Sequence, residues 1–555
     1  MLTKFESVNF PDIKDNAKQA ISSADKQDYS SSINLITEIQ SKLIAGEYQL
    51  CLDCLDSLPA SIFENQPRLG LIKAIAMVYC DYPVESIRQI ILDMEKIIPN
   101  EEIKGELLAI KAKIEVNIGH INQGIQLSHK AYSKIDKGNT FFRKLIERNL
   151  GIAYTVKGDM RNAVMWFENL LLSGFKINDF TDILVSYHYL AHIHKIQGQF
   201  NIASVIYRKA LTFINNNQLE KAAFGIKLIS GYGHLLIQRN KTTEAIHYLS
   251  KAIRLAEVTN KLYAHAAYHS LCEAYVRKSD LTKAVQTLKK FQGQISSLED
   301  HYKKLHSEYA KASEARINLA ANRIDEAYKW LLSRGFLSPS AERIQKNSLF
   351  ELGYSLPIAA KIYISKGMYS QAIELLSPII PKFVHRGANA YLIRGLNALA
   401  IAYYHSGASL KAMIILNKTI RLAEPENNIG DFVFIGKQLI PLLSENLKNN
   451  SSRKFIMKLI SVLSSTTEIS QIQAPIHENT LALSRREMEV LQLLSKGLSN
   501  QEIAENLFLS TNTIKSHTIK IYRKLNVNNR KRAVRKARLI GLLPENNIQI
   551  PHPST

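Results

Sequence analysis

The sequence predicts an all-α protein in which a long helical solenoid precedes a small four-helix domain. Three observations predict this fold class. Helical apolar spacing runs from about residue 35 to 445 with little strand patterning, one helix-pair pattern recurs along that stretch, and a short basic helical module follows a polar segment. The 555 residues are also too many for one compact core.

Composition indicates which partners and which cellular compartment suit the protein. Lys and Arg exceed Asp and Glu by 22 charges, which favours a polyanion such as nucleic acid, although a solvated basic surface gives the same excess. The four cysteines, Cys51, Cys54, Cys80 and Cys272, are too few for a disulfide framework. They lie in helical patterns, so we expect core thiols in a reducing cytoplasm.

The N-terminal segment, 1–34, has no apolar run and no cleavage site. Elsewhere no stretch approaches the roughly 18 to 20 continuous apolar residues that a membrane span needs. We therefore expect a cytoplasmic protein that has no membrane partner.

The repeat in 35–445 places a small residue in one helix and a second small residue twelve positions later, in the next helix. Successive copies are 39 to 45 residues apart. The eight pairs are Ala112 and Gly124, Gly151 and Ala163, Ala191 and Ala203, Gly233 and Ala245, Cys272 and Ala284, Ala315 and Ala327, Ala360 and Ala372, and Ala400 and Ala412. These copies resemble the tetratricopeptide (TPR) pattern, which implies stacked helix pairs with a concave surface.

Residues 446–480 change in character. A short amphipathic helix is expected first, and then a linker rich in Ser and Thr with one Pro. A separate domain is therefore predicted over 481–545, followed by a tail, 546–555.

Capping chemistry places four helices in 481–545. Ser484 with Glu487 and Ser499 with Glu502 have capping-box spacing, and Ser510 is expected to cap the third helix. Asn528 or Asn529 is expected to cap the fourth helix, whereas Gly497 and Gly541 are expected to end the first and the last. The predicted core is Val490, Leu491, Leu494, Ile503, Ala504, Leu507, Ile514, Ile521 and Leu525. With a tight turn at 507–510, this arrangement describes a helix-turn-helix.

The segment closely resembles the DNA-binding domain of the LuxR family. Matching residues include Leu483, Arg486, Glu487, Gly497–Asn500, Glu502–Ala504, Ser510, Thr513–Lys515, His517, Ile521–Tyr522, Lys524–Leu525 and Arg530. The resemblance implies sequence-specific binding to double-stranded DNA, usually by a homodimer on paired half-sites. Residues 484–543 contain 13 Lys and Arg against 4 Asp and Glu, which suits attraction to phosphates.

Helical geometry and the resemblance together select the candidate DNA contacts. Asn512, Lys515, Ser516 and Ile519 share one face of the third helix, so that Lys515 can meet a guanine and Ile519 a thymine methyl. The resemblance best supports Lys515, with Thr513 and Asn500 as backbone contacts, and we expect Lys520 and Arg523 to meet phosphates. Thr511 and Arg530 complete the predicted set.

Other interpretations of these residues stay open. Lys515 can be a solvated surface lysine, Ile519 can pack within a dimer, and His517 is expected to be packed or phosphate-facing. The basic run of Arg530, Lys531, Arg532, Arg535, Lys536 and Arg538 can serve solubility alone.

The whole arrangement, including residues 43–74 and 421–443, resembles the C-terminal half of MalT-type regulators. That resemblance implies that the repeats sense an inducer or an inhibitory protein, and it implies an N-terminal nucleotide-binding domain. No GxxxxGKS or GxxxxGKT motif occurs in the sequence, so we predict no nucleotide cofactor and no hydrolysis.

The fifth and ninth positions of each first helix are expected to line the concave groove. These positions hold Arg148, His188, His192, His234, His269, Glu273, Arg316 and Lys361. The set suggests an anionic or polyhydroxylated small effector, or an acidic partner segment, although a generic polar face has the same composition. His188 with His192, and His265 with His269, have metal-pair spacing but no third ligand, so no metal is predicted.

The leading hypothesis is a transcription regulator whose solenoid senses an effector or protein partner. RNA polymerase is a further partner if the chain activates transcription, and DNA binding would place it at the bacterial nucleoid. The alternative is an interaction scaffold that uses the helix-turn-helix for dimerisation or docking. No GxSxG, HExxH or Gly-rich dinucleotide motif occurs, so we predict no enzyme.

Overall fold

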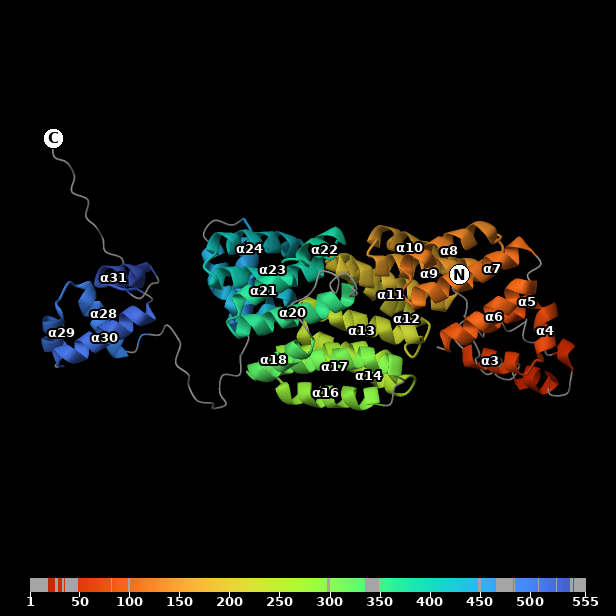
Figure 1. Ribbon diagram of the computed structural model, residues 1–555, viewed down its shortest axis with the longest axis horizontal. Coiled ribbons are helices and arrows are strands. Elements are labelled where there is room, and N and C mark those ends of the chain that lie inside the picture. The colour runs from red at the N-terminus through yellow and green to blue at the C-terminus, as the bar shows by residue number, and fades with distance from the viewer. Residues whose placement is uncertain are drawn as a thin grey trace, which may run out of the picture. The chain divides into compact units, whose positions relative to one another are not determined.

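The computed structural model describes residues 18–24, 28–31, 34, 48–80, 82–97, 100–296, 300–334, 349–447, 451–465, 483, 485–507, 509–525, 527–539 and 543. Within these residues the regular structure is helical throughout and includes no strand, which confirms the predicted all-α class. The chain divides into two compact units, Met1–Ile469 and Ser470–Thr555 (Figure 1). None of the described helices is both long and apolar enough to cross a membrane.

From Tyr48 onward, the described residues of the first unit begin with four helices and continue with stacked helix pairs. The opening helices are α3 (Tyr48–Asp56), α4 (Ala60–Asn65), α5 (Pro67–Tyr79) and α6 (Val84–Ile97). In the described part of the chain the pairs are α7 (Glu101–Asn117) with α8 (Ile121–Lys134), α9 (Thr140–Lys157) with α10 (Met160–Ile177), α11 (Phe180–Ile196) with α12 (Phe200–Asn216), α13 (Ala223–Gln238) with α14 (Thr242–Glu257), α15 (His265–Arg277) with α16 (Leu281–Ser296), α17 (Asp300–Ala320) with α18 (Ile324–Ser333), α20 (Leu349–Ser365) with α21 (Tyr369–Leu376), and α23 (Asn389–His405) with α24 (Ser409–Ala423).

Small residues hold each pair together, as the twelve-residue offset predicts. Ala400 and Ala412 are fully buried where α23 meets α24. A Cβ on Gly151 would lie 2.7 Å from the ring of Phe167, so even a methyl group is too large there. Close approach of two helices therefore depends on these positions, and the repeat frame is confirmed.

Short elements connect and close the array. They are η1 (Lys261–Ala264), α22 (Ile380–His385), η2 (Glu424–Glu426), α25 (Gly430–Ile435), η3 (Lys437–Leu439), α26 (Ile440–Asn446) and α27 (Arg453–Ser465). The short helix expected after residue 446 is α27, and it packs onto the array: Phe455, Ile456, Leu459 and Leu463 are buried in the main core. The part of 446–480 that precedes Ser470 thus belongs to the first unit.

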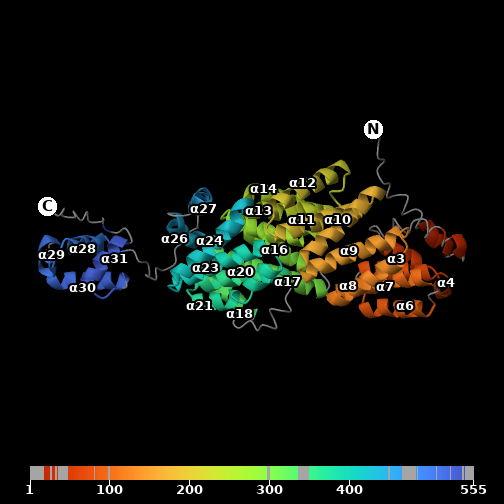
Figure 2. The ribbon, with the colours of Figure 1, turned by 90° about the horizontal axis from the view of Figure 1, so that it is seen from above.

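The first helices of six successive pairs contact one another in a closed ring. Figure 2 labels α11, α13, α17, α20 and α23 in the same part of the first unit. Each helix contacts the next in the order α11, α13, α15, α17, α20 and α23, and α23 contacts α11. We call this set the inner ring. The structure thus differs from an open concave groove, because by α23 the superhelix has turned far enough to meet its own earlier repeat.

A seam of contacts between distant segments closes the inner ring. The backbone N–H of Asn201, at the start of α12, donates to Glu426 Oε2 at 2.8 Å. Gly430 lies so close to α13 that a Cβ there would be 2.4 Å from the carbonyl oxygen of Ile237. The seam therefore requires a residue without a side chain at position 430.

The second unit holds the four predicted helices, α28 (Arg485–Ser495), α29 (Asn500–Leu507), α30 (Thr511–Lys524) and α31 (Arg530–Leu539). The predicted core residues are buried, apart from the partly buried Leu507, and Ala533 and Ala537 of α31 join them. Gly497 follows the end of α28 and has φ near +94°, a left-handed conformation that favours glycine. Ser484 and Gly541 lie outside the described residues.

Candidate nucleic-acid interface

Capping bonds fix the start of α30, the predicted recognition helix. The backbone N–H of Thr513 donates to Ser510 Oγ at 3.1 Å, and the two hydroxyls are 2.7 Å apart. The Ser499 and Glu502 capping box holds α29 with bonds of 2.6 and 3.3 Å. Asn529 caps α31 by accepting from the N–H of Arg532 at 2.9 Å, which decides between the two asparagines that the sequence offered.

One side of α30 packs inward and the opposite side is open. Ile514, Thr518 and Ile521 are buried. The exposed residues of α30 are Thr511, Asn512, Lys515, Ser516, Ile519, Lys520 and Arg523. We call this set the α30 face. Ile519 is 66% exposed, an unusual position for a large apolar side chain on so small a domain.

The cations of the α30 face keep their donors free of carboxylates. In the described residues no hydrogen bond or ion pair links Lys515, Lys520 or Arg523 to an acidic side chain. Three carboxylates of this unit are instead engaged elsewhere: Glu489 pairs with Arg486, Glu487 pairs with Lys524, and Glu502 caps α29. The α30 face therefore presents positive charge without local neutralisation.

The other predicted contacts have different surroundings. Asn500, half-buried, is the first residue of α29, and Thr513 is half-buried at the start of α30. Arg530 donates through Nη2 to the carbonyl oxygen of Leu494 at 2.7 Å, so part of its guanidinium holds the end of α28. Lys531 and Arg532 are exposed, whereas the side chains of Arg535, Lys536 and Arg538 lie outside the described residues.

Two contacts that support this domain escaped the sequence prediction. Lys524 Nζ lies 2.7 Å from Glu487 Oε2, and Glu487 is 4% exposed. Arg486 Nη2 donates to the carbonyl oxygen of Leu507 at 2.7 Å, at the end of α29. Both residues matched the family pattern, but their partners are 37 and 21 positions away, and no local spacing indicates such pairs.

The predicted groove residues gather around the inner ring, where each contacts another polar or aromatic group of the array. His269 Nδ1 lies 2.8 Å from both Ser313 Oγ and Tyr354 Oη. Glu273 accepts from Arg316 Nη1 at 2.5 Å and from Arg277 at 2.7 Å. These side chains line the inside of the ring, so they form a buried polar network in place of an open groove.

The remaining predicted groove residues lie at the same inner surface or beside it. His234 Nδ1 is 3.1 Å from Lys195 Nζ, and Lys361 Nζ donates to the carbonyl oxygen of Phe434 at 2.8 Å. The rings of His188 and His192 stack with centroids 6.2 Å apart. Arg148, on α9 just before the ring, pairs with Asp182.

Burial keeps the ring histidines neutral. It lowers the pKa of His192 to about 3 and holds the pKa values of His188, His234 and His269 well below their usual range. The pKa of Glu273 is also held well below its usual value, because the neighbouring Arg316 and Arg277 outweigh the effect of burial. At neutral pH the interior thus holds neutral imidazoles and the ionised carboxylate of Glu273.

The inner ring holds further charged residues that sequence reasoning missed. Arg394 Nε lies 2.5 Å from Asp431 Oδ1, and both residues are buried. Lys195 is 7% exposed. Arg394 precedes the small residue of its repeat by six positions and Lys195 follows its own by four, one turn outside the window used for the prediction.

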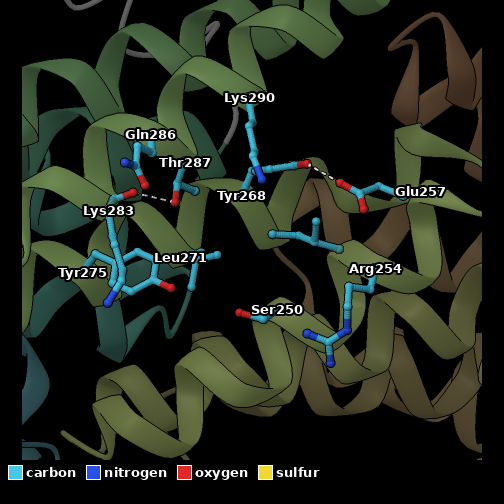
Figure 3. A pocket seen from close by; sticks show the side chains of 11 residues that line it. Ser250, Arg254, Glu257, Tyr268, Leu271, Tyr275, Lys283, Gln286, Thr287 and Lys290 are labelled. Carbon is cyan, nitrogen blue, oxygen red and sulfur yellow. Dashed lines mark hydrogen bonds between the residues drawn. The ribbon is translucent and has the colours of Figure 1, made fainter.

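A hollow of about 270 Å³ lies outside the ring, between α14, α15 and α16 (Figure 3). Its apolar floor includes Ile253 and Leu271. Arg254, Lys283 and Lys290 project around it, and Tyr268 Oη donates to Glu257 at 3.2 Å. We call this the outer hollow. Its lining includes three cations that an anion could contact.

Comparisons with known proteins match both units. The model of the MalT-like TPR region matches residues 105–449, and that of the bacterial regulatory proteins of the luxR family matches residues 481–537. The HTH-type transcriptional regulator MalT of Vibrio cholerae serotype O1 is 22% identical over 78% of this chain and 49% of its own length. MalT of Vibrio parahaemolyticus is 20% identical over 93% of this chain and 59% of its own length.

The chain thus spans between half and three-fifths of these relatives. Among solved structures, a Rap protein complexed with Competence and Sporulation Factor aligns with 65% of this chain and 99% of its own, at 12% identity and a TM-score of 0.48. Because the TPR match alone covers more than half of the residues, the chain belongs to the family defined by the MalT-like TPR region, and it carries a domain of the luxR family of bacterial regulatory proteins.

Proposed function

We propose that the chain is a sequence-specific DNA-binding transcription regulator that inserts α30 into the major groove. The α30 face carries the proposal, because it combines one large exposed apolar side chain with three cations that have no acidic partner in the described residues. A helix of this kind suits base edges and phosphates at once. The relatives named above are themselves HTH-type transcriptional regulators, which supports the same proposal.

Each residue of the α30 face has an assigned contact. Lys515 donates to a guanine edge, Ile519 packs on a thymine methyl, and Asn512 and Ser516 lie on the same exposed stretch. Lys520, Arg523 and Thr511 contact phosphates, as do Asn500 and Thr513 at the helix starts. Arg530 has a supporting bond to Leu494, and its remaining donors are assigned to a phosphate.

The MalT-like array is proposed to control this activity by sensing an effector or a protein partner. A homodimer would place two α30 helices on paired half-sites. RNA polymerase would be a further partner if the protein activates transcription. Such a protein acts in the cytoplasm, at the nucleoid when bound, and the proposal assigns it no catalytic activity.

One observation favours a second candidate, an interaction scaffold. Ile519 is exposed enough to belong to a protein interface, either in a dimer or with another protein. Affinity of a scaffold for duplex DNA would show neither sequence preference nor a steep dependence on salt, whereas both are expected of a regulator.

The proposal is tested by letting the full chain select duplexes from a random pool. Fluorescence anisotropy then measures its affinity for the selected duplex. Lys515→Ala should weaken binding to the selected duplex by about 5- to 150-fold and relax preference at one position. Lys520→Ala should weaken binding to all duplexes and reduce the salt slope by about 1. The exposed Lys289 of α16 offers a control, since Lys289→Ala removes the same charge from the array.

Thermal unfolding of all three variants should match that of the wild type, because these side chains are exposed. Failure of the pool to yield any preferred sequence would contradict sequence-specific binding. Equal affinity of the Lys515→Ala and wild-type chains would reject α30 as the recognition helix.

A further inference from the structure

The interior of the inner ring carries more positive than negative charge. Lys195, Arg277, Arg316, Lys361 and Arg394 face this region from five of the six helices, and among the described residues the carboxylates beside them are Glu273 and Asp431. Glu273 is shared between two arginines, and Asp431 serves Arg394. Lys195 contacts the neutral imidazole of His234, and Lys361 contacts a backbone carbonyl.

Such an imbalance is costly inside a protein, since buried charges need a counter-charge. Arginine cannot relieve the imbalance by losing a proton. Lysine can do so in part: burial and the nearby Arg394 lower the pKa of Lys195 to about 8. Arg316 and Arg394 therefore stay charged, at 6% and 3% exposure.

The two arginines also have donors left over. Arg316 Nε and Nη2 and Arg394 Nη2 are buried and have no hydrogen-bond partner. Aromatic faces lie beside them instead: the guanidinium carbon of Arg316 is 5.4 Å from the ring centre of Phe434, and that of Arg394 is 5.3 Å from it. Lys361 Nζ is 5.6 Å from the same ring.

Phe434 thus lies against three cations that come from α17, α20 and α23. It belongs to α25, a helix of six residues preceded by Asn427 with φ near +48° and followed by Gly436 with φ near +97°. Cation–π contact with Phe434 offsets only a part of the free-energy cost of burying these cations, and a bound anion would offset more of it. The ring of Phe434 therefore occupies a position from which an anion would reach the guanidinium groups of Arg316 and Arg394.

We infer that the inner ring binds a small anion with a carboxylate or phosphate group, held by Arg316 and Arg394 after Phe434 moves aside. Lys195, on the helix α11 that contacts α23, supplies the third cation. The inference rests on the proposal that the array senses an effector, and it names the class of that effector. Burial of these residues favours a small anion over an acidic protein segment. The freed N–H groups of the arginines suit the oxygen geometry of either group.

Thermal unfolding of the full chain in inorganic phosphate or in citrate, each against sodium chloride at equal ionic strength, tests the inference. The bound anion should raise the midpoint of the array transition by about 3 °C or more over chloride. Phosphate and citrate also raise midpoints by exclusion from the protein surface, so only the part of the rise that Lys195→Met loses is attributed to binding. The two probes separate the sources, because a phosphate site responds to the first and a carboxylate site to the second. An equal midpoint in all three salts would overturn the inference.

Lys195→Met provides the decisive variant, since no carboxylate in the described part of the chain pairs with Lys195 and would be left unpaired. Calorimetric titration of the full chain with the active probe should show binding weakened about tenfold or more. Arg254→Gln is the matched control, because it removes one cation from the outer hollow. Loss of binding in Arg254→Gln with full binding in Lys195→Met would assign the anion to the outer hollow and overturn the ring site.

Phe434→Ala tests whether the Phe434 ring must move before the anion binds. It also keeps the inference testable if Lys195→Met fails to fold. Removing the ring should leave binding as tight as in the wild type or tighter, and weaker binding would contradict displacement. Affinity for the selected duplex, measured with and without the probe, separates the two proposals. An anion that binds while DNA binding is absent would retain this inference and reject the regulator.

Discussion

At the residue scale, distant charged pairs decide what the local sequence pattern leaves open. The period of α30 was enough to predict its buried and exposed sides, because one helix obeys a single geometric rule. The Glu487–Lys524 pair joins α28 to α30 over 37 positions, and no rule of spacing indicates it. Sequence reasoning therefore found the surface of the candidate interface more readily than its support.

Lys524→Gln should loosen the second unit, because it leaves the buried carboxylate of Glu487 without its charged partner. Lys524 itself is partly exposed, so solvent limits the loss to about 1 to 2 kcal/mol. Hydrogen exchange in the full chain should show faster exchange in α28 and α30. Adding Glu487→Gln should restore part of the protection, and unchanged exchange in Lys524→Gln would show that the pair has no stabilising role.

At the element scale, small residues and caps explain most of the architecture. The twelve-residue offset identified all eight helix pairs, because it reflects direct contact between neighbours in the chain. The short helix α25 was not predicted: its six residues are too few for a periodic signal. Its position depends on contacts with α13 and the inner ring, which lie far away in sequence.

Gly430→Ala should open the seam, since the added Cβ would lie 2.4 Å from Ile237 O and 2.6 Å from Gln238 O. We expect a loss of about 1 to 3 kcal/mol in the free energy of unfolding, as for other overpacked sites. Gly293→Ala supplies the control. It adds the same methyl group to α16 in open space, where it should stabilise the helix by up to about 1 kcal/mol. If the denaturant midpoints of Gly430→Ala and Gly293→Ala shifted from the wild type by the same amount, the close contact at position 430 would not stabilise the array.

At the scale of the whole molecule, closure of the inner ring is the feature that sequence analysis could not reach. A repeat length of 39 to 45 residues predicts a superhelix unlike a regular array, but the turn per repeat is the sum of many small packing angles. The predicted groove residues other than Arg148 all lie on helices of the inner ring. Their burial follows from the contact between α11 and α23, which no repeat encodes by itself.

Acid should destabilise the array, because its buried histidines are neutral when folded. Burial lowers the pKa values of His265 and His306 to about 4, against about 6.5 in the unfolded chain. The unfolded state therefore binds more protons below pH 6.5, so stability is present above that pH and is lost as the pH falls toward 4. Each such histidine lowers the free energy of unfolding by about 1.4 kcal/mol at most for every unit by which the pH falls in this range.

Urea midpoints between pH 7.5 and 5 check this expectation. His265→Phe should flatten the dependence, because the side chain at this position is 2% exposed and lies beside Phe291. The exposed His247 gives the matched control, and His247→Gln should retain the wild-type slope. A slope that is the same in all three chains would contradict the assigned histidine.

Contact between α11 and α23 also constrains how this array can change in evolution. Linear repeat proteins gain or lose units freely, because every unit meets only its two neighbours. Here a duplicated or deleted helix pair between α11 and α23 would carry the later segment past its partner, and Asn201 would no longer meet Glu426. The number of pairs in this stretch should therefore be fixed among proteins that keep the seam, while pairs before α11 remain free to vary.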